Sequence, residues 1–73
     1  MPYEVKSAGE ATRIATSFLR QYYAFIRPVS AVREGSTWVV KMDIGAIQES
    51  IAEIKVDALT ADITGYTFPG KRG

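Results

Sequence analysis

The chain has 73 residues, of which 47% are hydrophobic, and its nine basic and eight acidic side chains give a formal net charge of +1. This length predicts one small domain over residues 1–73, with the apolar content of a globular protein rather than a disordered chain. The small net charge argues against a strong global attraction to nucleic acid or to an anionic membrane.

The chain contains neither cysteine nor histidine. These residues supply the thiol nucleophile, the usual general base near neutral pH and the common zinc ligands. We therefore expect no catalytic, cofactor-binding or metal-binding residue, and the predicted function is non-enzymatic. Asp57 and Asp62 do not have the spacing of a calcium-binding loop, so turn capping is the better interpretation of these two side chains.

The N-terminal residues and the hydropathy pattern bear on location. No stretch reaches the roughly 18 consecutive apolar residues of a membrane-spanning helix. The segment from Met1 to Val5 lacks the basic start and the apolar run of a signal peptide. We expect a cytoplasmic protein if Met1 is the native start, whereas a trimmed fragment would leave the location unknown.

An amphipathic helix is predicted over about residues 7–26. Ser7 and Glu10 have the spacing of a capping box, in which the Ser7 hydroxyl accepts from the Glu10 amide and the Glu10 carboxylate reaches back to the Ser7 amide. Pro28 disfavours helical geometry at Arg27 and sets the expected end of the helix. Apolar side chains recur on one helix face at Ala11, Ile14, Ala15, Phe18, Leu19, Tyr22, Phe25 and Ile26.

Antiparallel strands are predicted over about residues 29–33, 37–44, 52–58 and 62–68. The second has the clearest period-two pattern, and it places Trp38 in the core, where we expect it beside Phe18 and Tyr22. Residues 46–58 also fit helical spacing, but their β-branched side chains favour a loop followed by a strand. The predicted fold is α+β, with one N-terminal helix packed on a three- to four-stranded antiparallel sheet.

The stretch from Ile54 to Tyr66 predicts a strand, a polar turn and a second strand. Here Val56, Asp57, Ala58, Thr60, Asp62 and Ile63 resemble a pattern of the PepSY domain family: Val-Asp-Ala, a variable residue, Thr-Gly, an acidic residue and Ile. The departure is Ala61, where the family favours glycine. Glycine there fits a turn residue with positive φ, a conformation that costs an alanine about 1 kcal/mol.

The resemblance to PepSY domains covers about residues 8–68 and includes an aromatic strand before this stretch, supplied here by Trp38. It implies a helix before an antiparallel sheet and a protein-binding or regulatory module, of which modulation of a peptidase is one form. A weaker resemblance, to the O-type gas-vesicle accessory proteins, implies a self-associating structural or accessory protein. It rests on Trp38, Asp57, Gly65, Tyr66, Lys71 and Arg72.

Partner binding is predicted on the last strand and on the flank of the helix. Residues 62–68 carry no Lys or Arg, so this strand would be a weakly protected edge, open to another polypeptide or to a second copy in an edge-strand homodimer. Tyr23 flanks the apolar stripe, and exposed tyrosines are common at interfaces. The predicted partner-binding residues are Ile63, Thr64, Tyr66, Phe68, Tyr23, Arg20 and Arg13.

The arginines of the helix support a third interpretation. Lys6, Arg13, Arg20 and Arg27 recur every seven residues, which on a helix gives a basic stripe that suits phosphates or an acidic partner. A solvated helix face is the better interpretation, because the net charge is small and no aromatic side chains interleave with the stripe. Nucleic-acid binding is therefore the least favoured of the three functions.

Overall fold

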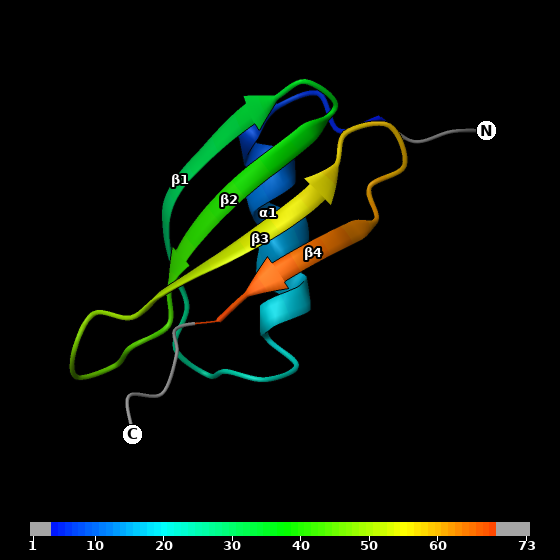
Figure 1. The fold of residues 1–73 in the computed structure, drawn as a ribbon. Coiled ribbons are helices and arrows are strands. Elements are labelled where there is room, and N and C mark those ends of the chain that lie inside the picture. Colours follow the sequence, from blue (N-terminus) through cyan, green and yellow to red (C-terminus); the bar gives the residue numbers. More distant parts are fainter. Residues whose placement is uncertain (1–3, 69–73) are drawn as a thin grey trace.

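The computed structural model describes residues 4–68, which form a single helix and a four-stranded antiparallel sheet. The elements are α1 (Ala8–Leu19), β1 (Arg27–Glu34), β2 (Thr37–Asp43), β3 (Ile51–Asp57) and β4 (Ile63–Thr67). The strands lie in the order β1-β2-β3-β4, and α1 crosses one face of the sheet (Figure 1). The predicted α+β fold is confirmed. Lys71 and Arg72, on which the gas-vesicle resemblance partly rests, lie outside the described residues.

The start of α1 has the predicted cap. The amide of Glu10 donates to the Ser7 hydroxyl at 3.2 Å. The Glu10 carboxylate accepts from the amide of Lys6 at 2.8 Å, one residue before the amide that the capping box favours. Ser7 itself is extended, with φ −137° and ψ 157°, as an N-cap residue should be.

The end of α1 differs from the prediction, which placed it near Ile26. The helix ends at Leu19, whose carbonyl accepts from the amides of both Tyr22 and Tyr23 at 2.9 Å and so closes the last turn. Continued to Ile26, the helix would run about 10 Å further, at 1.5 Å per residue, past the place where the chain must turn back into β1. Of the apolar residues after Leu19, Tyr22 and Tyr23 instead contact Phe68, which follows β4.

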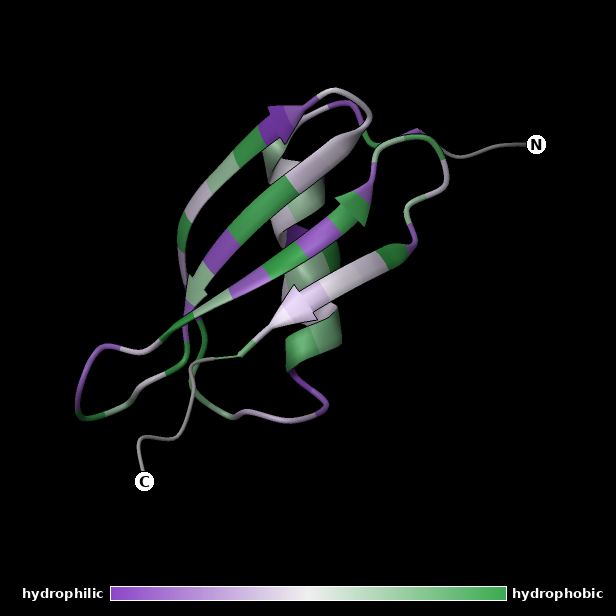
Figure 2. Cartoon of the chain, in the orientation of Figure 1, coloured by the Kyte–Doolittle hydropathy of each residue, from purple (hydrophilic) through white to green (hydrophobic). Residues whose placement is uncertain are grey.

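The strands begin and end within two residues of their expected bounds. A helix over residues 46–58 is wrong, because residues 44–50 form a loop and β3 follows it. Figure 2 shows hydrophilic and hydrophobic residues alternating along β3, and in β2 buried residues alternate with less buried ones, which is the pattern of strands buried on one face.

The core lies between α1 and the face of the sheet that α1 covers. Three small or branched side chains of α1, Ala11, Ala15 and Leu19, are fully buried there. The alanines let the helix approach the strands closely, and burial of each large aliphatic side chain stabilises the fold by about 1.5–3 kcal/mol. The sheet and its flanking segments contribute Val5, Trp38, Val40, Met42, Ala52, Ile54, Val56 and Ala58.

Trp38 is buried, with 8% of its surface exposed, but it does not lie beside Phe18 and Tyr22 as expected. Its indole Nε1 donates to the Val5 carbonyl oxygen at 3.0 Å, which places it at the start of α1 rather than at the end where Phe18 lies. The Val5 amide in turn donates to the Ala58 carbonyl at 2.7 Å. The segment before α1 is thus tied to both β2 and the turn after β3.

Asp43 organises the loop between β2 and β3. Its side chain is buried, and its Oδ1 accepts from the amides of Gly45 and Ser50 at 3.0 and 3.1 Å. Its Oδ2 accepts from Nη2 of Arg27 at 2.8 Å. The two amides and the guanidinium favour the carboxylate and hold the pKa of Asp43 below its ordinary value of 3.8, although burial opposes them.

Candidate partner-binding surface

The outer side of β4 is one of the two edges of the sheet. Across residues 4–68, no strand pairs with that side. The strand has the sequence Ile-Thr-Gly-Tyr-Thr, without a charge or a proline. Figure 2 shows the result, since β4 is pale along most of its length whereas the end of β1 is strongly hydrophilic. Charges and prolines are the usual protection of an edge, so β4 is open to pairing.

The backbone of β4 alternates between pairing with β3 and facing outward. The Asp57 amide donates to the Asp62 carbonyl, and the Thr64 hydroxyl donates to the Lys55 carbonyl, so Asp57 and Lys55 present their backbone groups to β4. In register, Lys55 is opposite Gly65. Because successive residues of a strand face opposite neighbours, the amide and carbonyl of Tyr66 are directed to the free edge.

An aromatic cluster lies where α1 ends and β4 ends. Phe18 is 5.2 Å from Tyr66 and 5.6 Å from Tyr22, measured between ring centroids. Phe68 contacts Tyr66, Tyr22 and Tyr23 at 5.0, 6.1 and 5.4 Å. Pairs in this range each add about 0.5–1.5 kcal/mol. We call these five residues the aromatic cluster; Tyr22 and Tyr66 are 58% and 55% exposed, so the cluster also presents apolar surface to solvent.

The predicted residues of the last strand all lie at this edge, in different surroundings. Ile63 is half-buried and packs against the core. Thr64 is exposed and occupies the β-bulge, where the register moves from Lys55 opposite Gly65 to Val56 opposite Ile63. Tyr66 and Phe68 belong to the aromatic cluster, and so does Tyr23 from beyond the helix.

Arg13 and Arg20 are exposed but do not join this surface. At about 100° per residue, Phe18 lies roughly 140° around the helix from Arg13 and roughly 200° from Arg20. Since Phe18 contacts β4 through Tyr66, the two arginines lie on another side of α1. The structure brings Ile63, Tyr66, Phe68 and Tyr23 together and leaves the arginines apart.

Sequence reasoning assigned Phe18 and Tyr22 to the core, and Phe18 does pack against it, but it missed that both residues also belong to this surface. Phe18 and Tyr22 are four residues apart, which is the spacing of one side of a helix, and Tyr66 and Phe68 are two apart, which is the spacing of one face of a strand. These two spacings are the signal that could have joined them, but pairing the helix end with the last strand requires the fold.

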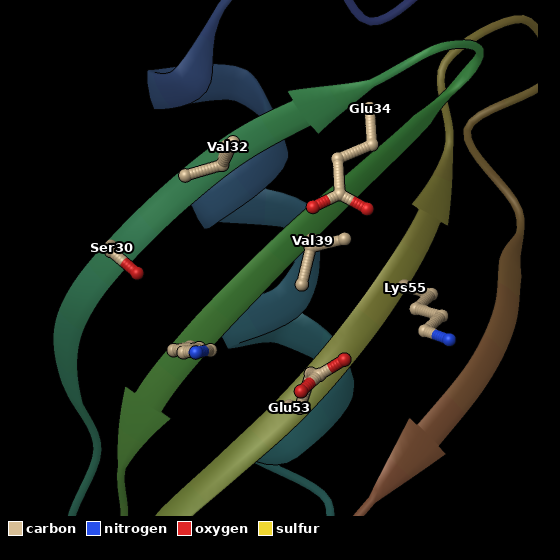
Figure 3. Close-up of a pocket in the computed structure, with 7 residues that line it drawn as sticks. Ser30, Val32, Glu34, Val39, Glu53 and Lys55 are labelled. Carbon is tan, nitrogen blue, oxygen red and sulfur yellow. The ribbon is translucent and has the colours of Figure 1, made fainter.

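A second feature is a shallow hollow of about 250 Å³ on the sheet face opposite α1 (Figure 3). It is lined by Ser30, Val32, Glu34, Val39, Lys41, Glu53 and Lys55. Its charged side chains have both signs and are spread across three strands, so they do not form a binding site for one particular kind of ligand.

Within residues 4–68, no three carboxylates are grouped so that they could hold a metal ion. No helix among these residues is long and apolar enough to cross a membrane.

The described part of the chain is a small α+β domain in which one helix covers a four-stranded antiparallel meander and leaves an uncharged outer strand. Comparison of the chain with protein-family models, with curated proteins and with solved structures gave no significant match.

Proposed function

We propose that this protein is a non-enzymatic binding module that takes up an extended segment of another polypeptide as a fifth strand beside β4. The supporting observation is the uncharged outer side of β4 with the aromatic cluster alongside it. In this mode, backbone hydrogen bonds provide affinity and alternate side chains provide specificity. A protein-binding or regulatory role of this kind is also what the resemblance to PepSY domains implies.

The two parts of the surface have separate tasks. The outward amide and carbonyl of Tyr66 pair with the backbone of the incoming segment. The aromatic cluster covers those side chains of the segment that point to the helix side of the sheet. Exposed Tyr22 and Tyr66 supply rigid, amphipathic contact area, which is typical of residues at the centre of binding surfaces.

Site-specific photocrosslinking tests this proposal. Benzoylphenylalanine replaces Tyr66 in one variant and Val32 of β1 in the control, because these two side chains are 55% and 52% exposed but lie on opposite edge strands and opposite faces of the sheet. We expect an adduct with another polypeptide from position 66 and none from position 32. Equal labelling at both positions, or none at position 66, would contradict the proposal.

The mass of the adduct decides who the partner is. An adduct of twice the protein's own 8.0 kDa would show pairing with a second copy, which is the self-associating alternative that the gas-vesicle resemblance implies. An adduct of any other mass identifies a different polypeptide.

A further inference from the structure

Gly65 leaves a gap on the open face of β4 that Lys55 covers. The two residues are opposite each other in the register of β3 and β4. A Cβ atom at position 65 would lie 3.9 Å from Cδ of Lys55 and within 4 Å of no other side chain or distant backbone atom. Figure 3 shows Lys55 extending from β3 into the space beside β4. The aliphatic part of Lys55 therefore packs beside Gly65, on the side of β3 that faces β4.

The ammonium of Lys55 has no acidic partner within residues 4–68, where Arg27 and Asp43 form the ion pair. Glu53 and Asp57 flank it on its own strand and Lys41 is nearby on β2, all on the same face. The Asp57 carboxylate accepts from the amides of Leu59 and Thr60, which holds it in the turn. The Lys55 side chain thus brings a cation beside a strand that has no charged residue of its own.

A strand added beside β4 would place one residue opposite Gly65. That residue lies on the open face, two strand spacings or about 10 Å from the β3 backbone, a gap that Lys55 and an acidic side chain can bridge across Gly65. Its two neighbours in the added strand point to the helix side, where the aromatic cluster and Ile63 present apolar surface.

We infer that the segment bound by β4 carries an acidic residue flanked by apolar residues, with the acidic side chain held by Lys55. This inference rests on the proposed function. It also favours a different polypeptide over a second copy as the partner. Paired with itself, β4 would bring no carboxylate to Lys55, because Ile-Thr-Gly-Tyr-Thr contains none.

Two short synthetic peptides test the inference with the full chain. Each consists of threonine and valine with one central residue between valines, glutamate in the first peptide and lysine in the second. We expect the glutamate peptide to bind about tenfold more tightly in fluorescence anisotropy at low salt, because one peptide pairs with Lys55 and the other repels it. The preference should fall as salt is added.

Charge variants test whether Lys55 causes the preference for the glutamate peptide. Lys55→Gln should remove this preference, and Lys55→Glu should reverse it in favour of the lysine peptide. Lys41→Gln is the matched control: it has the same charge and face but lies a strand further from β4, so the tenfold ratio should persist. Fluorescence of the buried Trp38 checks that each variant is folded.

The outcomes separate the two proposals. Equal binding of both peptides to the wild-type chain would overturn the role of Lys55 while leaving edge pairing intact. A preference that survives Lys55→Gln, or that Lys41→Gln also removes, would overturn it as well. If neither peptide binds at any salt concentration, the inference fails together with the proposed function.

Discussion

The two hairpins of the sheet, β1–β2 and β3–β4, protect their outer strands very differently. β1 carries Arg27, Pro28, Arg33 and Glu34, and its register is interrupted by a bulge after Pro28. β4 is shorter and carries neither charge nor proline. Each device on β1 is a known means of preventing further pairing. The same chain therefore blocks one edge and leaves the other open, which is why we propose binding at β4 rather than at sheet edges in general.

The turns of the two hairpins also differ, because a residue with positive φ is a glycine in the first and an alanine in the second. In the β1–β2 turn, Gly35 has φ 65° and Ser36 a negative φ, the combination of a type II′ turn, and glycine adopts it without strain. In the β3–β4 turn, the residue with positive φ is Ala61, at 68°. The turn of the first hairpin is therefore free of backbone strain, whereas the turn of the second carries the strain of an alanine with positive φ. Such departures tend to gather where function constrains the sequence.

The first prediction, with the largest effect, compares how much a side chain of each hairpin contributes to the stability of the core. Trp38→Ala in β2 should lower the free energy of unfolding by about 3–5 kcal/mol, because it removes a buried indole and its hydrogen bond to Val5. Tyr66→Ala in β4 should cost only about 1 kcal/mol, since its ring is half exposed. Urea denaturation followed by far-UV circular dichroism measures both.

If Tyr66→Ala lowered the free energy of unfolding as much as Trp38→Ala, the expected difference between the two hairpins would be wrong. It would mean that the aromatic cluster is a second core rather than a binding surface. The expected loss for Trp38→Ala is a large part of the roughly 4–11 kcal/mol that a chain of this length has in total, so partial unfolding of that variant agrees with the prediction.

The outcome for Trp38 also shows how far sequence reasoning reaches. Period-two alternation identified β2 and the burial of Trp38, because one strand face must be covered by the helix. Its partner, the Val5 carbonyl, lies 33 residues away in sequence, and no local pattern encodes such a contact. The end of the helix was missed for a related reason. The apolar spacing continues beyond Leu19, but there Tyr22 and Tyr23 pack against Phe68, which follows β4, rather than extend the helix.

For the candidate surface, too, one part could be predicted from the sequence and another part required the fold. The composition of residues 62–68 was enough to predict an unprotected edge, because charge and proline can be seen directly in the sequence. The direction of Arg13 and Arg20 depended on which helix side meets β4, and that is set by the Phe18–Tyr66 contact. Ala61 is the opposite case: the PepSY pattern pointed to a positive φ at a position where alanine itself gives no hint.

The second prediction concerns the ion pair that joins β1 to β2. Unfolded, Asp43 takes up a proton near its ordinary pKa of 3.8, whereas in the fold Gly45, Ser50 and Arg27 keep it charged to lower pH. Its contribution to stability is therefore complete above pH 3.8 and is lost as the pH falls through the lowered pKa. We expect a smaller effect than that of Trp38→Ala.

Asp43→Asn is the matched variant for this measurement, since its amide oxygen can still accept from the two loop amides. Urea denaturation of both proteins between about pH 2 and pH 6 should show a steeper acid loss for the wild-type chain. Parallel curves for the two proteins would indicate that the carboxylate is not preferentially stabilised in the fold.

The third prediction tests the turn of the first hairpin. Gly35→Ala should destabilise the protein by about 1–2 kcal/mol, because alanine is strained at φ 65°. Crowding cannot be the cause, since a Cβ at this position would meet no atom within 4 Å outside the neighbouring residues. Thermal unfolding with a buried-Trp38 fluorescence readout is sufficient. An unchanged melting temperature would show that this turn tolerates a side chain and that the hairpins do not differ as described.

The last prediction makes the reverse change in the second hairpin and has the smallest effect. Ala61→Gly relieves about 1–2 kcal/mol of backbone strain at φ 68°. Against this, glycine adds about 0.4–1 kcal/mol of conformational entropy to the unfolded chain, and the half-buried methyl group loses part of its packing against the core. The net result should lie between no change and a gain of about 1 kcal/mol in urea denaturation. Opposite signs for Gly35→Ala and Ala61→Gly would sharpen the contrast between the hairpins, whereas a clear loss for Ala61→Gly would show that the contacts of the methyl group outweigh the strain at this turn.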